Sequence, residues 1–289
     1  GRPEYTQPEI LRTNLASVIL QMAQADLGDI ATFPFLDAPD PAQVNDGLRL
    51  LSELGALQST DRRHPRLTRI GHQLAKLPVD PRLARMLVEA AHRGCLREVL
   101  VIVSGLAVQD VREWPVDQRA QADQAHRRFW SDAVLADADQ PTSAREELGR
   151  PAQMAALGGP APDHESPSAI SARAMGGDIL ALLRLWSYLV RRRRQLSGNQ
   201  FRRLCRTEYI NYLRVREWQD LHTQLVQICA DLGLAGNRQA ASIEQVLISV
   251  LSGLLSQIGL ADLSPSTPAR HGGQRSHRRP QLTYRGARG

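Results

Sequence analysis

Residues 67–87, LTRIGHQLAKLPVDPRLARML, decide the fold, because they contain two helix starts one after the other. Thr68 is placed to cap a helix through Leu74, since its hydroxyl can accept a hydrogen bond from a free backbone N–H. Asp80-Pro81 begins a second helix, where proline at the first position loses no hydrogen bond. That helix runs to Gly94, and its inward residues follow helical spacing: Leu83, Met86, Leu87 and Ala90. The stretch therefore predicts a mainly α protein.

The residues before this stretch predict two helices and a small β-hairpin. A capping box at Thr6–Glu9 starts the first helix, which ends near Gly28. Asp40-Pro41 starts the second helix, which ends at Gly55. Two strand-like pieces then flank a charged loop; the pieces are 56–59 and 66–68, and the loop is 60–65. This order predicts a winged helix, whose loop is either an ordinary exposed turn or a wing that touches nucleic acid or a neighbouring domain.

The residues after the stretch predict helices on both sides of a polar insertion. Residues 96–108 are apolar almost all round and predict a buried helix, and 117–130 predict a more polar one. Residues 131–177 contain seven acids, three arginines and no aromatic residue, so they predict a flexible acidic insertion that cannot bury enough apolar surface to order itself. Helical spacing returns at Asp178. The later predicted helices begin at Ser197, at Thr207 (running to about Leu232) and at Ser242.

The charge of the chain is basic, and its source is arginine. The 36 Lys and Arg against 30 Asp and Glu give a net charge of +6, and the pI near 9.8 keeps nucleic acid among the candidate partners. Lys76 is the only lysine and does not stand in a Gly-x-x-x-x-Gly-Lys-Ser/Thr loop, which excludes a conventional nucleotide-phosphate loop in these residues.

Other classes are disfavoured by patterns that the sequence lacks. There is no run of about 18 apolar residues and no signal-peptide pattern, so we expect neither a membrane-spanning nor a secreted protein. The three cysteines are far apart, which predicts buried thiols in a reducing compartment, the cytoplasm. The eight histidines show no metal-ligand spacing. Residues 163–166, Asp-His-Glu-Ser, lie in the predicted flexible insertion, where no scaffold could hold a catalytic triad. We therefore predict no catalytic and no metal-binding residue.

The arginines of residues 178–232 are the remaining signal. Ten arginines face five acids there, a net charge of +5, and Tyr209 and Tyr212 are interleaved with them. Such a segment is typical of contact with a nucleic-acid backbone. The alternative is structural: Arg191–Arg194 complement a helix dipole, and Arg216 forms an i,i+4 pair with Asp220. The candidate RNA-binding residues are Arg202, Arg203, Arg206, Arg214 and Arg216.

Several stretches resemble DEAH-box RNA helicases. Residues 9–20 resemble the opening of that family's winged helix, and 67–71 followed by 77–87 resemble its passage into the helicase-associated, or ratchet, domain. Residues 201–209 and 211–218 are similar to the bacterial HrpA branch, and 284–288 resemble the start of that branch's OB-fold. The acidic insertion departs from the family, which joins these helices more directly.

The resemblance implies the accessory region of an ATP-dependent 3′-to-5′ RNA helicase. Upstream RecA-like domains of the same polypeptide would bind ATP and Mg²⁺. We expect both ends of the sequence to be truncation points. The retained part would guide single-stranded RNA and couple to those domains without hydrolysing ATP. The implied domains are a winged helix at 1–68, a ratchet domain at 69–130 and 178–260 around the insertion 131–177, a linker at 261–280 and a truncated OB-fold entry at 281–289.

Two other readings stay open at this point. The first is a free-standing winged-helix nucleic-acid-binding module, whose recognition helix would lie at 42–54. That helix offers Gln43, Asn45 and Arg49 beside two acids, which is a poor base-reading surface. The second is a structural scaffold, which predicts no RNA binding.

Overall fold

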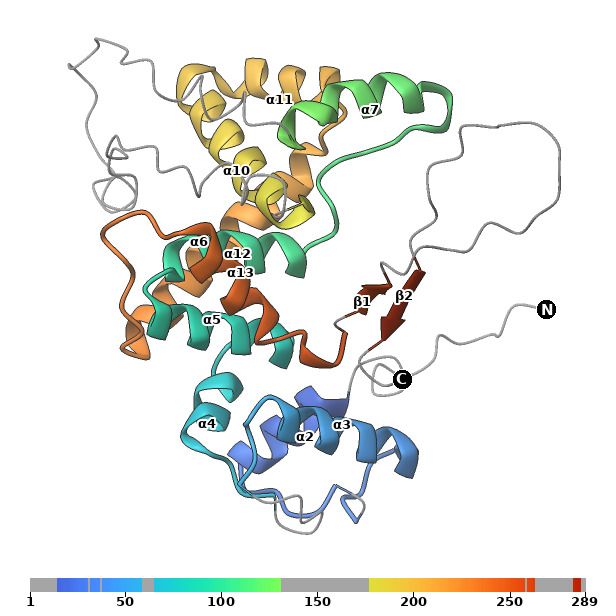
Figure 1. Ribbon diagram of the computed structural model, residues 1–289, viewed down its shortest axis with the longest axis vertical. Helices are drawn as coiled ribbons and strands as arrows, with labels where there is room; N and C mark the ends of the chain where they lie inside the picture. The colour runs from blue at the N-terminus through green and yellow to red at the C-terminus, as the bar shows by residue number, and fades with distance from the viewer. Residues whose placement is uncertain are drawn as a thin grey trace, which may run out of the picture. The chain divides into compact units, whose positions relative to one another are not determined.

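The computed structural model describes residues 15–30, 32–36, 38–58, 65–130, 177–257, 259–262 and 283–286. The chain divides into two compact units, Gly1–Gly253 and Leu254–Gly289. The described part is mainly helical, as predicted (Figure 1). In the described part of the first unit the helices are α2 (Leu15–Gln24), α3 (Pro41–Glu53), α4 (Arg69–Ala75), α5 (Pro81–Arg93), α6 (Leu96–Ala107), α7 (Arg119–Arg127), α10 (Gly177–Gln195), α11 (Gly198–Thr207), α12 (Tyr212–Asp231) and α13 (Ile243–Leu251).

The helix starts follow the predicted caps. The Asp40 carboxylate accepts a hydrogen bond from the backbone N–H of Ala42 at 2.9 Å and opens α3. Thr68 accepts one from Gly71 at 3.0 Å and opens α4, and the Asp80 carboxylate caps α5. The predicted capping box at Thr6–Glu9 lies outside the described residues.

The winged-helix part consists of α2, α3 and α4, held together by close contacts. The Gln21 side chain donates to the carbonyl of Ala75 at 2.9 Å, which fixes the end of α4 against α2. Gly71 lies so close to the carbonyl oxygen of Ala56 that a Cβ atom at this position would stand 2.2 Å from it. The predicted hairpin is seen only as one antiparallel bridge, between Leu57 and Leu67. Most of its loop lies outside the described residues.

The ratchet part begins with α5, α6 and α13, which pack against one another. As predicted, α6 is a buried helix, with Val99, Ile102 and Val103 fully covered. Gly253 follows α13 and touches the start of α5: a Cβ there would lie 2.3 Å from the carbonyl oxygen of Arg82. The predicted polar helix at 117–130 is shorter than expected, because α7 is flanked by the 3-10 turns η1 (Val116–Gln118) and η2 (Arg128–Trp130).

A second core joins α10, α11 and α12 to α6. Its centre is Trp218, whose ring N–H donates to the carbonyl of Val101 at 3.1 Å and to the Ser104 hydroxyl at 3.0 Å. Gly105 leaves room for this ring, since a Cβ there would approach it to 2.9 Å. The other buried members include Phe129, Leu185, Leu189, Phe201, Cys205, Ile210 and Val215. The segment similar to the HrpA branch therefore supplies much of a core.

Of the remaining predictions, some are confirmed and others concern residues outside the described ranges. All three cysteines are free and buried, as predicted. Residues 131–176, in the predicted insertion, lie outside the described residues. The second unit contains the 3-10 turn η4 (Leu255–Gln257) and an antiparallel pair of strands, β1 (Gly259–Asp262) and β2 (Thr283–Gly286), with Gly259 opposite Gly286. The sequence did not predict β1, and the OB-fold entry stays a prediction.

Candidate nucleic-acid interface

Three of the candidate arginines belong to α11, and the other two belong to the start of α12. Ser197 caps α11: its hydroxyl accepts from the N–H of Gln200, and the Gln200 side chain accepts from the N–H of Ser197 at 2.9 Å. Phe201 and Cys205, one turn apart, are buried. Because side chains four residues apart share a helix face, this burial leaves the opposite face of α11 to solvent.

Helical structure is interrupted between α11 and α12. The sequence predicted one long helix here, from Thr207 to about Leu232. That prediction is wrong, because Tyr209 takes a left-handed backbone conformation, with φ of 55°. Its carbonyl accepts from the N–H of Glu113 at 2.8 Å. The neighbouring Ile210 is buried in the turn. Asn211 then caps α12 by accepting from two backbone N–H groups of its first turn.

A half-buried polar cluster locks this turn from the other side. Glu208 accepts a hydrogen bond from the Tyr188 hydroxyl at 2.7 Å and forms an ion pair with Arg128. The guanidinium of Arg128 lies 4.5 Å from the centre of the Tyr188 ring. The Nε2 atom of His126 lies 3.0 Å from the carbonyl oxygen of Glu208, so this nitrogen carries the proton and donates it. Burial lowers the pKa of His126, against the opposing effect of these carbonyls, and the ring is neutral at pH 7.

The structure sorts the five candidate arginines into three groups. Arg203 and Arg206 are exposed on α11, and their side chains form no hydrogen bond or ion pair with any described residue. Arg202 and Arg216 are also exposed, but both lie beside Tyr212; the two guanidinium groups, Arg216 first and then Arg202, lower the pKa of that phenol. Arg214 donates to the carbonyl of Asp110 at 2.9 Å, so it ties α12 to the segment before α7.

The Tyr212 cluster, formed by Arg202, Tyr212 and Arg216, brings two positive charges together around one phenol. The Arg202 guanidinium lies 5.1 Å from the centre of the Tyr212 ring, in cation–π contact. A neutral phenol cannot balance two guanidinium charges, although Asp220 acts on Arg216. With Arg203 and Arg206 on the same helix as Arg202, this surface can accept an anion such as a phosphate group.

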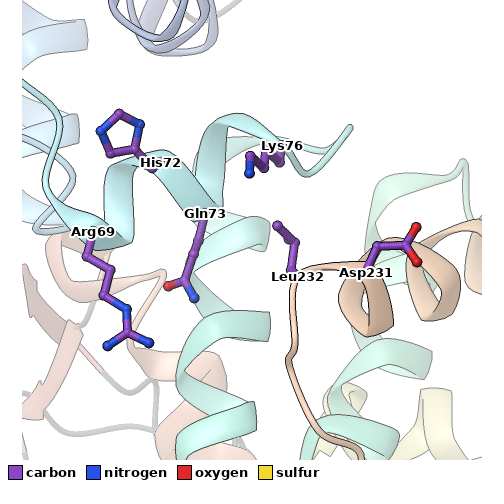
Figure 2. A pocket seen from close by; sticks show the side chains of 6 residues that line it. All are labelled: Arg69, His72, Gln73, Lys76, Asp231 and Leu232. Carbon is purple, nitrogen blue, oxygen red and sulfur yellow. The ribbon is translucent and has the colours of Figure 1, made fainter.

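A second basic feature, which the sequence did not indicate, lies between α4 and the end of α12. It is a cavity of about 450 Å³. Figure 2 shows the residues that line it: Arg69, His72, Gln73, Lys76, Asp231 and Leu232. Arg69, His72 and Gln73 belong to α4, and Lys76 follows its last residue. The only signal in the sequence was the single lysine, and nothing there indicated that α12 would end beside it.

The described residues contain neither a metal-binding cluster nor a membrane-spanning helix. Among them, no group of three or more His, Cys, Asp or Glu side chains is arranged to hold a metal ion. None of the helices in that part of the chain has both the length and the apolar character needed to cross a membrane. The residues 163–166 considered above lie outside the described ranges.

Comparison with known proteins gives relatives for both helical parts. Residues 47–79 match the family described as helicase associated domain (HA2), winged-helix, and residues 80–154 match helicase associated domain (HA2), ratchet-like. The ATP-dependent RNA helicase HrpA of Escherichia coli is 46% identical over 263 residues, which cover 91% of this chain and 17% of that protein. The HrpA homolog of Haemophilus influenzae is 42% identical over 265 residues, with the same coverage. The chain thus spans about one sixth of the length of these relatives.

Proposed function

We propose, on the premise that the chain is a HrpA-like DEAH-box helicase C-terminal region with winged-helix and ratchet-like parts, that it guides single-stranded RNA. The observation that carries the proposal is the exposed basic face of α11. Arg203 and Arg206 are free of side-chain partners among the described residues, and the Tyr212 cluster adds two more guanidinium groups beside them. Backbone phosphates are the anions that such a sequence-independent surface takes.

Positioning supports the proposal as well as charge. Contacts to a translocating RNA strand require a rigid surface. The helices α11 and α12 meet this requirement, because they are fixed to the core by Phe201, Cys205 and Trp218. The turn between the two helices is held by residues about 100 positions earlier in the chain, through the bond from Glu113 to Tyr209. The arginine surface is therefore mounted on a packed scaffold.

A titration with a 20-nucleotide single-stranded RNA tests this proposal. The double variant Arg203→Ala/Arg206→Ala should bind on the order of tenfold more weakly at about 0.1 M salt, because two phosphate contacts are lost. The variant Arg49→Ala/Arg119→Ala is the matched control, since it removes two exposed arginines from α3 and α7. It should stay within about twofold of the unchanged protein. RNA binding that is absent in the unchanged chain would reject the proposal.

The coupling part of the proposal concerns the whole polypeptide. In a HrpA-like helicase, RecA-like domains that bind ATP and Mg²⁺ would drive translocation along RNA, and the present region would transmit that motion. Translation of the reading frame upstream of Gly1 tests this directly. A phosphate loop and an Asp-Glu-Ala-His motif are expected there, and a stop codon without either would contradict it. The buried free thiols support a reducing compartment, so the proposed location is the cytoplasm.

The winged-helix module on its own gains no support from α3. Arg49, its candidate base-reading arginine, lies 3.8 Å from the carboxylate of Asp46 on the same helix. An arginine that faces its own acid is poorly placed to read a base edge.

A further inference from the structure

We infer that the cavity between α4 and the end of α12 is a second contact for the RNA backbone, used by the same strand that crosses α11. The inference rests on the proposed function, because it assigns another part of the molecule to the same ligand. Four observations carry it: the free cations of the cavity, the orientation of the nearby acid, the spacing along α4, and the length of α12.

The positive charge of the cavity has no partner in the described part of the chain. Arg69 and Lys76 are exposed, and neither side chain forms a hydrogen bond or ion pair with a described residue. Arg69 opens α4, Gln73 follows one turn later on the same face, and Lys76 stands directly after the last residue of the helix, Ala75. Figure 2 shows Arg69 and Gln73 extending from the same side of α4. An amide N–H and two cations together suit a phosphate oxygen.

The one acid that lines the cavity does not neutralise these cations. Asp231 accepts a hydrogen bond from the Gln227 side chain at 2.9 Å, one turn back along α12. Its carboxylate is turned away from α4, and Leu232 lies between the two (Figure 2). His72 is also engaged elsewhere, since its Nδ1 lies 2.8 Å from the side-chain oxygen of Gln24. The unbalanced charge on the α4 side therefore belongs to Arg69 and Lys76.

The helix α12 sets the separation of the two basic surfaces. It is continuous from Tyr212, in the arginine cluster, to Asp231, at the cavity. At about 1.5 Å per residue, these two positions are about 28 Å apart along the helix axis. Buried residues along its length, Val215, Trp218 and Leu225, hold it to the core, so this separation is fixed. A stacked single strand at about 3.4 Å per nucleotide covers it with about eight nucleotides.

This geometry predicts a dependence on RNA length that a single basic surface would not show. A 20-nucleotide strand can reach both surfaces at once, and the second contact then forms at a high effective concentration. A strand of four stacked nucleotides spans about 14 Å and can occupy only one surface at a time. The cavity should therefore matter for the long strand and hardly at all for the short one.

The test uses the full 289-residue chain and compares two double variants against both RNAs. Arg69→Ala/Lys76→Ala should weaken binding of the 20-nucleotide RNA on the order of tenfold and lower the slope of log K against log salt by about 1.4. Its affinity for the four-nucleotide RNA should change by less than about twofold. Arg49→Ala/Arg119→Ala should change neither. Because all four positions are exposed, thermal unfolding should be the same for the three proteins, which checks that each folds.

The outcomes separate this inference from the proposed function. If Arg203→Ala/Arg206→Ala weakens binding while Arg69→Ala/Lys76→Ala does not, the proposed function stands and the cavity contact is rejected. The cavity would then be a candidate for an acidic protein partner instead. An equal loss on the short and the long RNA would also overturn the inference, because it would show that the two surfaces are not bridged by one strand. If the unchanged chain binds neither RNA, both proposals fail.

Discussion

The basic residues near the two ends of α12 differ in the contacts that they make. At the N-terminal end, Arg214 donates to a backbone carbonyl, and Arg202 and Arg216 lie beside Tyr212. At the C-terminal end, Arg69 and Lys76 face a cavity without side-chain partners among the described residues. The first group lies in a segment similar to the HrpA branch, and much of that segment serves the fold. A basic residue in a family motif is therefore not always available to a ligand.

The largest expected effect comes from the core beneath the N-terminal end of α12. Trp218→Ala should lower the free energy of unfolding by about 3–5 kcal/mol, because it removes a fully buried ring and leaves the Ser104 hydroxyl with one partner fewer. Urea unfolding followed by circular dichroism measures this. Leu213→Ala is the control at an exposed position of the same helix, and it should cost less than about 0.5 kcal/mol. Equal losses would mean that this end of α12 is not fixed by its core.

A somewhat smaller effect is expected from pH at the middle of α12. Burial lowers the pKa of His222 to about 4, and its ring packs 4.7 Å from Trp186. Between pH 6.5 and about 4 the unfolded chain binds a proton that the folded chain does not, so stability falls as the pH falls through this window. The full loss from this group is about 3 kcal/mol at most.

Urea unfolding at several pH values, with His222→Phe beside the unchanged protein, isolates this contribution. The variant should lose stability less steeply between pH 6.5 and 4. The lowered pKa of His126 also makes stability fall as the pH falls, so the His222→Phe variant should keep some pH dependence. Identical slopes in both proteins would show that His222 is accessible to water and titrates normally.

A smaller stability effect concerns the polar cluster that locks the turn before α12. Glu208→Gln should cost about 1–2 kcal/mol, because Arg128 loses its charged partner while Tyr188 keeps a neutral acceptor. Glu217→Gln, at an exposed position of α12, is the matched control and should stay within about 0.5 kcal/mol. Hydrogen exchange at the N–H of Asn211 should accelerate in the first variant alone, since that N–H bonds to the carbonyl of Val111 across the locked turn. Unchanged exchange would assign the locking to the backbone bonds.

The helix starts could be predicted from the sequence because their causes are local. Asp40, Thr68 and Asp80 each cap a helix through a backbone N–H two or three residues away. The capping boxes at Ser197 and Ser242 were recognisable for the same reason. In every case the donor and the acceptor stand together in the printed sequence.

The break between α11 and α12 could not be predicted, because its cause is distant in the chain. The left-handed Tyr209 is held by Glu113, and Glu208 is held by Arg128 and Tyr188. The bonds to Glu113 and Arg128 join residues on opposite sides of the predicted insertion 131–177. Helical periodicity is a local pattern and does not predict contacts so distant in the sequence. The cavity was missed for a related reason: Lys76 and Asp231 are 155 positions apart, and only the packing of α5, α6 and α12 brings their helices near each other.

The salt dependence of RNA binding tests the central claim, that Arg203 and Arg206 of α11 contact RNA whereas Arg214, which is bound to a backbone carbonyl, serves the fold. Arg203→Ala/Arg206→Ala should reduce the slope of log K against log salt by about 1.4, which corresponds to two lost phosphate contacts. Arg214→Ala should leave the slope unchanged while lowering the free energy of unfolding by about 1 kcal/mol, since it loses the bond to Asp110. The opposite pattern, with the slope reduced by Arg214→Ala and unaffected by the double variant, would contradict the account.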